Sequence, residues 1–226
     1  MTATTNNITP KLGEGIFLVK DVAQILNIDY EKARRWIVGY WDGNLKQHFN
    51  YTFGENKSKA INFYSLIEFY TFFKLREAHI GATEIRRLHE DLSVKLGTPY
   101  PFAVVQDYLI EDRKYKKFVF VQFADGLFKH DGKEKLYFNF LQVFLDKIEF
   151  NDNNIASKFY PLGKDKNIVV DPKCQFGQPT IKDTNIKTQS IFSLYKGGET
   201  EENISILYDL SVEKVKDAID FCQKAA

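Results

Sequence analysis

The chain has 226 residues, enough for two or three small domains, and 44% of them are hydrophobic, including 20 Phe and 12 Tyr. This supply of apolar side chains excludes a disordered chain and predicts globular domains with packed cores. With 31 Lys and Arg against 30 Asp and Glu, the formal charge is only +1, so any affinity for nucleic acid must come from a local patch.

The two cysteines, Cys174 and Cys222, form no CxxC pair, which favours reduced, buried thiols over a disulfide framework. No apolar run approaches the roughly 18 residues that a membrane-spanning helix needs. Residues 1–14 are polar and lack the basic and apolar regions of a signal peptide. We therefore expect a flexible tail on a cytoplasmic protein.

Residues 15–38 predict two helices joined by a short turn. Apolar residues at helical spacing mark the first helix, and Asp29 is a suitable N-cap for the second, which runs from Tyr30 to Val38. Asn27 lies in the turn, where asparagine tolerates a positive φ. The expected inward positions of the first helix are Val19, Val22, Ala23 and Leu26.

This pattern resembles the MerR-type winged helix-turn-helix, whose consensus is an Ala-x-x-Leu helix, a Gly-Val turn and a Leu-Arg-Arg-Trp recognition helix. Asn27 replaces the turn glycine, and the matching positions are Ala23, Leu26, Ile28, Arg34, Arg35 and Trp36. The resemblance implies that residues 30–38 form the helix that enters the major groove of DNA.

The next segment follows the order of elements in that fold. Strands are predicted at 51–53 and 60–63, and the polar residues 54–59 predict the hairpin tip of a wing. Phe72 falls off the inward stripe of its helix, so we expect it to mark a partner surface. Two helices are predicted over 64–77 and 83–96, with inward side chains Leu66, Phe69, Tyr70, Phe73, Ile85, Leu88 and Leu92. Residues 15–97 form the predicted MerR-like domain.

The middle region, residues 98–172, predicts a small α+β connector. It begins at a linker whose residues Pro99 and Pro101 cannot continue a helix. Strands are predicted at 109–110, 118–123, 156–160 and 168–170, and a helix over 136–148.

Residues 173–226 predict an irregular arm, Gly177 to Ile186, followed by three short helices. The first helix, over 188–195, ends at the glycines of positions 197 and 198, and Thr200 and Ser211 are suitable N-caps for the other two. The expected inward positions are Ile191, Leu194, Tyr195, Ile204, Leu207, Tyr208, Val212, Val215, Ile219 and Cys222. The predicted domain is a trihelical, homeodomain-like bundle with a second helix-turn-helix. The whole chain is therefore predicted as α+β and mostly helical.

The arm and bundle resemble the bacterial and archaeal "domain of unknown function four hundred and thirty-three". That family reads Gly-x-Pro-x-Ile, Gly-Thr-Arg-Ile, a helix, Gly-x-Ser, Glu-Glu-Ile and a terminal helix. Asp183 and Asn185 depart from the family's glycine and arginine. The matching residues are Gly177, Pro179, Ile181, Thr184, Ile186, Gly198, Glu201, Glu202, Ile204, Leu210, Ser211, Val215 and Ala218.

Basic residues gather in the predicted recognition helix and wing, where they can read base edges and hold phosphates. The candidate DNA-binding residues are Tyr30, Lys32, Arg34, Arg35, Lys57 and Lys59. An ordinary solvated face is the alternative, because residues 15–97 hold 12 Lys and Arg against 10 Asp and Glu.

The C-terminal domain is a poorer candidate for DNA binding. Residues 167–226 hold 7 Lys and Arg against 9 Asp and Glu. The last helix mixes both signs on what we expect to be a solvated surface, at Glu213, Lys214, Lys216, Asp217 and Asp220. We therefore expect this domain to serve in protein contact or dimerisation.

The sequence carries no motif of a known catalytic or cofactor site. HExxH, zinc-type Cys/His clusters, the Walker loop, GxGxxG and GxSxG are all absent. Glu199, Glu201 and Glu202 are interpreted as a solvated helix start rather than as a metal site. We expect no catalysis, no cofactor and no metal.

The three regions together resemble the long VapB-type antitoxins, whose partner is a PIN-like ribonuclease toxin. The resemblance implies an antitoxin of a type II toxin-antitoxin pair, a homodimer that neutralises its toxin and represses its own promoter. The alternative is a stand-alone MerR-like transcriptional regulator with a ligand-sensing middle domain. A third hypothesis is a phage or scaffold interaction module that does not touch DNA.

Overall fold

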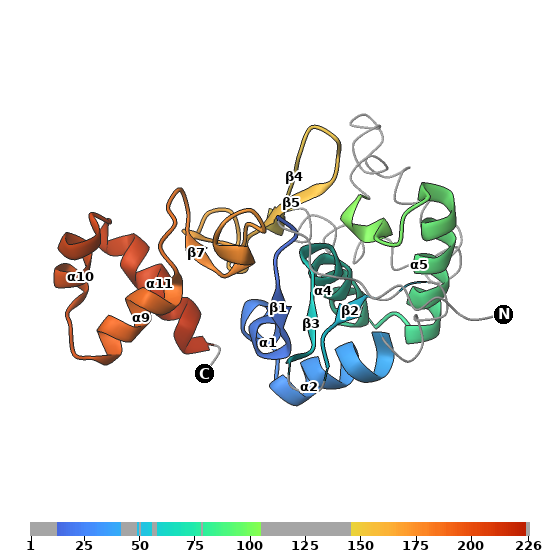
Figure 1. Ribbon diagram of the computed structural model, residues 1–226, viewed down its shortest axis with the longest axis horizontal. Helices are drawn as coiled ribbons and strands as arrows, with labels where there is room; N and C mark the ends of the chain where they lie inside the picture. Colours follow the sequence, from blue (N-terminus) through green and yellow to red (C-terminus); the bar gives the residue numbers. More distant parts are fainter. Residues whose placement is uncertain are drawn as a thin grey trace. The chain divides into compact units, whose positions relative to one another are not determined.

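The computed structural model shows a mixed α and β protein and describes residues 13–41, 49, 51–55, 58–77, 79–104 and 146–224 (Figure 1). The chain divides into two compact units, residues 1–63 with 158–226, and residues 64–157. The predicted domain boundaries after residues 14, 97 and 172 stay predictions. Most of the predicted tail, the strands at 109–110 and 118–123, and residues 136–145 of the predicted helix lie outside the described residues.

The first unit begins with a small sheet and two helices. Its elements are β1 (Phe17–Leu18), α1 (Val19–Leu26), α2 (Tyr30–Arg34), the π-helix η1 (Arg35–Trp41), β2 (Thr52–Phe53) and β3 (Ala60–Ile61). The strand order is β1-β3-β2, with both pairs antiparallel and Ile61 opposite both Phe17 and Thr52. The two predicted wing strands therefore form, and β1 completes their sheet.

The turn between α1 and α2 forms as the sequence predicts. Asn27 takes the left-handed conformation with φ 51°, and Asp29 Oδ1 accepts a hydrogen bond of 2.9 Å from the Lys32 backbone N–H. Beyond Arg34 the helix changes to π geometry, which the sequence did not predict. Because a π-helix has more residues per turn, side chains after this point leave the expected α-helical spacing.

The C-terminal part of the same unit combines short strands with a helical bundle. Its elements are β6 (Ile168–Val169), the 3₁₀-helix η4 (Gln175–Gly177), β7 (Thr180–Ile181), α9 (Thr188–Lys196), α10 (Glu201–Tyr208) and α11 (Val212–Lys224). β6 pairs antiparallel with β7, and Ile168 lies opposite Ile181. Figure 1 shows α9, α10 and α11 grouped in a bundle in which α9 packs against both other helices.

Most of the predicted bundle is confirmed, but two inward positions are wrong. Ile191, Ile204 and Val215 are fully buried, whereas Tyr195 is 37% exposed and Leu207 is 67% exposed. Phe192 is buried in place of Tyr195. In α9 and α10, which have nine and eight residues, apolar residues adjoin the apolar face on both sides. The neighbouring helix therefore decides which of these side chains is buried.

The elements of the second unit are α4 (Phe63–Glu77, apart from Phe63), α5 (Ala82–Leu96), the 3₁₀-helix η3 (Pro101–Ala103) and β4 (Ile148–Phe150). Strand β4 pairs with β5 (Ala156–Phe159). The boundary between the units falls within β5. Both predicted helices are confirmed. The predicted helix end at Ile148 is wrong, because this residue begins β4 and its pairing with β5 overrides the local pattern.

Helix α4 is buried on more than one face. Leu66, Phe69 and Phe73 are buried as predicted, but Phe72 is only 2% exposed, so its assignment to a partner surface is wrong. Glu68 is also fully buried and accepts a hydrogen bond of 3.0 Å from the Ala103 backbone N–H. Its other carboxyl oxygen lies 3.1 Å from His89 Nε2, and burial raises the pKa of Glu68. This carboxyl group joins α4 to α5 and η3.

The arm meets β1 within the first unit. Ile16 N–H donates to the Phe176 carbonyl at 2.9 Å, and Gly177 lies against the Phe17 ring with φ +85°. A Cβ at position 177 would clash with that ring. The family-motif glycine is therefore required by both its conformation and its packing.

Replacing Gly177 with alanine should lower the free energy of unfolding by about 2–4 kcal/mol, because a positive φ and an overpacked contact add their costs. Gly198→Ala is the matched control, since φ there is +98° but no heavy atom lies within 4 Å of the added Cβ. The control should lose only about 1 kcal/mol. Urea unfolding measures both, and equal losses would contradict the packing argument.

Candidate nucleic-acid interface and C-terminal arm

The predicted recognition helix exposes basic side chains to solvent, together with Glu31. Tyr30 is 46% exposed, and Lys32, Arg34 and Arg35 are also exposed on α2 and the start of η1. Arg34 Nη1 lies 3.7 Å from Glu31 Oε2, a solvated pair that leaves its guanidinium largely free to rearrange. Arg35 makes no ion pair with the part of the chain that the structure describes. The structure therefore brings four of the six candidate residues together.

The wing is only partly described. Lys59, directly before β3, is partly exposed, and Lys57 lies outside the described residues. Near the tip, Ser58 N–H donates to the Glu55 carbonyl at 2.9 Å, and Gly54 takes a positive φ of 75°. These features place Lys59 at the base of an ordinary polar hairpin.

The family-motif residues of the arm close a tight turn. Thr184 Oγ1 donates to the Ile181 carbonyl at 2.8 Å and accepts from the Ile186 backbone N–H at 3.1 Å. The Ile181 N–H donates back to the Ile186 carbonyl at 2.9 Å. The Pro179 carbonyl accepts the N–H of Thr188, the first residue of α9, at 3.0 Å. The arm therefore positions the start of the bundle.

Four further motif residues also have structural roles. Ile204 and Val215 are buried, and the positive φ of Gly198 follows the end of α9. Leu210, between α10 and α11, accepts a hydrogen bond of 2.5 Å from Ser205 Oγ through its carbonyl. These contacts give the four residues a structural explanation, which the residue pattern could not separate from a binding role.

The two departures from the family pattern are explained locally. Asp183 has φ +64°, a left-handed conformation that a glycine adopts without strain and that Asp tolerates better than most residues. Asn185 Oδ1 accepts from Cys174 Sγ at 3.1 Å, and the Asn185 carbonyl accepts from Gln175 Nε2 at 3.2 Å. Asn185 thus binds the turn before the arm. Both cysteines are free thiols as predicted, although Cys174 is only partly buried.

A polar pocket of about 330 Å³ lies beside this turn. Its wall includes Lys158, Lys182, Asp171, Asp183, Cys174 and Asn185. Because two lysines are balanced by two aspartates, the lining selects neither an anion nor a cation.

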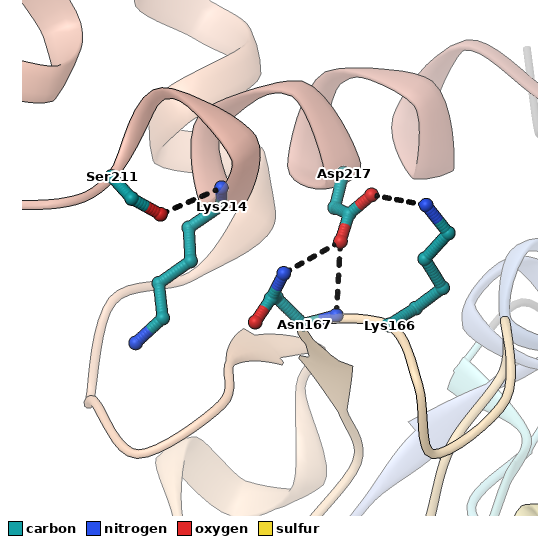
Figure 2. A network of polar contacts seen from close by, with 5 residues as sticks. All are labelled: Lys166, Asn167, Ser211, Lys214 and Asp217. Carbon is teal, nitrogen blue, oxygen red and sulfur yellow. Dashed lines mark hydrogen bonds and ion pairs between the residues drawn. The ribbon is translucent and has the colours of Figure 1, made fainter.

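A buried carboxylate on α11 anchors the bundle to the loop before β6. Asp217 is 3% exposed, and its Oδ2 accepts from the backbone and side-chain nitrogens of Asn167 at 3.0 and 2.8 Å. Its Oδ1 accepts from Lys166 Nζ at 3.1 Å (Figure 2). Lys214, one turn earlier, donates to the Lys182 carbonyl at 3.3 Å and makes a second connection, from α11 to the arm.

The electrostatics of Asp217 favour its charged form. Burial raises the pKa of the carboxyl, but the hydrogen bonds from Asn167 and Lys166 outweigh it, so the pKa lies below its usual range. The expectation that Asp217 belongs to a solvated surface is therefore wrong. Its position beside Ala218 and Ile219 on the buried stripe was the available signal, because a carboxylate there needs partners.

Comparisons with known proteins find one family match and two relatives that each align over part of the chain. Residues 168–222 match the family described as "Protein of unknown function (DUF433)". A protein of Mycobacterium tuberculosis named "Putative antitoxin VapB45" is 25% identical over 96 residues, 42% of this chain and 40% of that relative. "Uncharacterized protein Rv2308" of the same organism is 35% identical over 57 residues, 25% of this chain and 24% of that relative. The aligned regions thus span well under two thirds of either relative.

The fold is shared with a solved structure. The crystal structure of Rv2018 from Mycobacterium tuberculosis aligns with 90% of this chain and 97% of its own, at a TM-score of 0.68 and 19% identity. No helix among the described residues is long and apolar enough to cross a membrane. Within the same residues, no three His, Cys, Asp or Glu side chains gather as a metal site would require.

Replacing Asp217 with alanine should lower the free energy of unfolding by about 2 kcal/mol, because the partly buried Asn167 donors lose their acceptor. Asp220→Ala is the matched control on the exposed side of α11, and it should change stability by less than about 0.5 kcal/mol. Chemical denaturation of the two variants tests the anchor. Equal stabilities would show that Asp217 does not anchor the bundle.

The contribution of Asp217 should depend on pH in one direction. The pKa of Asp217 in the folded protein lies below the ordinary value of 3.8. The stabilisation that the carboxylate provides is therefore complete above pH 3.8, and it is lost as the pH falls through the folded-state pKa. The stability difference between wild type and Asp217→Ala should therefore narrow below about pH 4. Urea unfolding between neutral and acidic pH measures this, and a difference that widens in acid would contradict it.

Proposed function

We propose that the chain is the antitoxin of a type II toxin-antitoxin pair and has no catalytic activity of its own. The observation that carries the proposal is the similarity to the protein named "Putative antitoxin VapB45", together with the DUF433 match at residues 168–222. The exposed basic side chains of α2 and the start of η1 add a means of binding DNA. The antitoxin binds and neutralises a PIN-like ribonuclease in the cytoplasm and represses its own promoter.

The promoter-binding element of this proposal is the MerR-like helix-turn-helix at residues 15–97. Helix α1, the Asn27 turn and α2 occur in the required order, and the β2–β3 hairpin follows as a wing would. Lys32, Arg34 and Arg35 are exposed where a recognition helix needs donors for bases and phosphates. A homodimer would double these contacts, which compensates for the modest charge of one copy.

The toxin-binding element is assigned to the C-terminal bundle. Residues 167–226 hold 7 Lys and Arg against 9 Asp and Glu, which disfavours phosphate binding and leaves protein contact as the more economical use. The arm and Asp217 hold this bundle in a defined geometry, which a specific protein contact requires.

A stand-alone regulator with a ligand-sensing region is the second candidate. The polar pocket of about 330 Å³ supports it, since its wall includes Lys158 and Asp171 from the predicted connector and its volume suits a small ligand. The two functions differ in their partner. Expression with the neighbouring reading frame decides between them, because only an antitoxin should co-purify with that product and restore growth of cells that express it.

Replacing Arg34 and Arg35 with alanine should weaken binding to the chain's own promoter at least about tenfold at fixed salt and make the salt dependence shallower. Fluorescence anisotropy with the upstream DNA measures both quantities. The matched control is Arg86→Ala/Arg87→Ala, another adjacent arginine pair on α5, which should bind as wild type does. Equal losses in the two double variants would reject α2 as the recognition helix.

A further inference from the structure

Helix α10 exposes two adjacent aliphatic side chains. Ile206 is 80% exposed and Leu207 is 67% exposed, although α10 is held in the bundle by the fully buried Ile204. Elsewhere in the described chain, Val94 on α5 is 86% exposed but stands singly, which is ordinary for a protein surface. The pair on α10 leaves a contiguous apolar surface uncovered.

The surroundings of this pair are strongly acidic. Residues 197–212 contain four Asp and Glu and no Lys or Arg. Glu202 and Asp209 are exposed and lie one helical turn before and after Ile206. Glu201 is partly neutralised, since it lies 3.5 Å from Lys216 Nζ on α11. The outward face of α10 is therefore apolar in the middle and negative at its ends.

This combination limits what can cover the face. Phosphate groups are repelled by an acidic segment without basic residues, which excludes nucleic acid. A second copy related by a two-fold axis would bring the acidic residues of both copies together, which disfavours self-association. A different protein with an apolar patch bordered by Lys or Arg matches both properties.

We infer that the outward face of α10, centred on Ile206 and Leu207, binds a partner protein through an apolar patch with a basic border. The inference deepens the proposed function, on which it rests, because it places toxin binding on α10. The homodimer of that proposal then uses another surface.

The test compares Ile206→Glu/Leu207→Glu with wild type in binding to the purified product of the neighbouring reading frame, by calorimetry with the full chain. The double variant should lose at least about tenfold in affinity, because desolvated aliphatic contacts at an interface centre dominate binding. Val94→Glu is the matched control and should bind within about twofold of wild type. Circular dichroism and thermal unfolding show whether the bundle remains folded.

A second variant tests the charge without removing the apolar contact. Glu202→Lys should weaken binding and reduce its dependence on salt, whereas Asp91→Lys, an exposed charge reversal on α5, should not. Because Glu202 is exposed, this variant keeps the inference testable even if the glutamate pair unfolds the bundle.

The outcomes separate the two levels of the proposal. A wild-type chain that does not bind the neighbouring product overturns the antitoxin function and the occupant assigned to α10. If both α10 variants bind the neighbouring product as tightly as wild type does, only the assignment of toxin binding to α10 is overturned. If the α10 variants lose a dimer that light scattering shows for wild type, the α10 face binds a second copy of the chain. If they lose promoter affinity in anisotropy, the face binds DNA. Either result would overturn the inference that it binds a partner protein.

Discussion

The buried carboxylate of Asp217 is the interaction on which the C-terminal half of the first unit depends. A charge that is 3% exposed is tolerated only because Asn167 and Lys166 satisfy both of its oxygens. These partners belong to the loop before β6, while Asp217 belongs to α11. The network thus joins segments 50 residues apart in sequence. It explains how a helical bundle and a short strand pair form one body.

The arm makes a second set of contacts with the bundle. Thr184 closes the turn through its hydroxyl, and the Pro179 carbonyl receives the first N–H of α9. Gly177 lies against Phe17, so the family motif also contacts the first strand of the chain. Gly177, Pro179 and Thr184, which a sequence pattern presents as a functional signature, therefore have structural roles. The proposed binding surface lies on α10, where the motif residue Glu202 is exposed together with Ile206 and Leu207.

The two helix-turn-helix candidates differ in the side chains that they expose. Helix α2 exposes Lys32, Arg34 and Arg35, whereas α10 exposes Ile206 and Leu207 among carboxylates. The two surfaces thus suit different partners, since phosphate binding needs basic side chains and protein binding needs apolar surface. This contrast fits the proposed function, in which one surface binds a promoter and the other binds a toxin.

The sequence by itself determined the local structure: the capping residues Asp29, Thr200 and Ser211, the left-handed Asn27, and the bounds of most helices. These depend on neighbours within one or two turns, so the pattern contains the information. Tertiary structure decided the rest. It buried Phe72 and Asp217, exposed Leu207, and paired Ile148 in a strand. In each case the outcome depended on which distant segment covers a side chain or pairs with the backbone, and helical or strand periodicity carries no record of that.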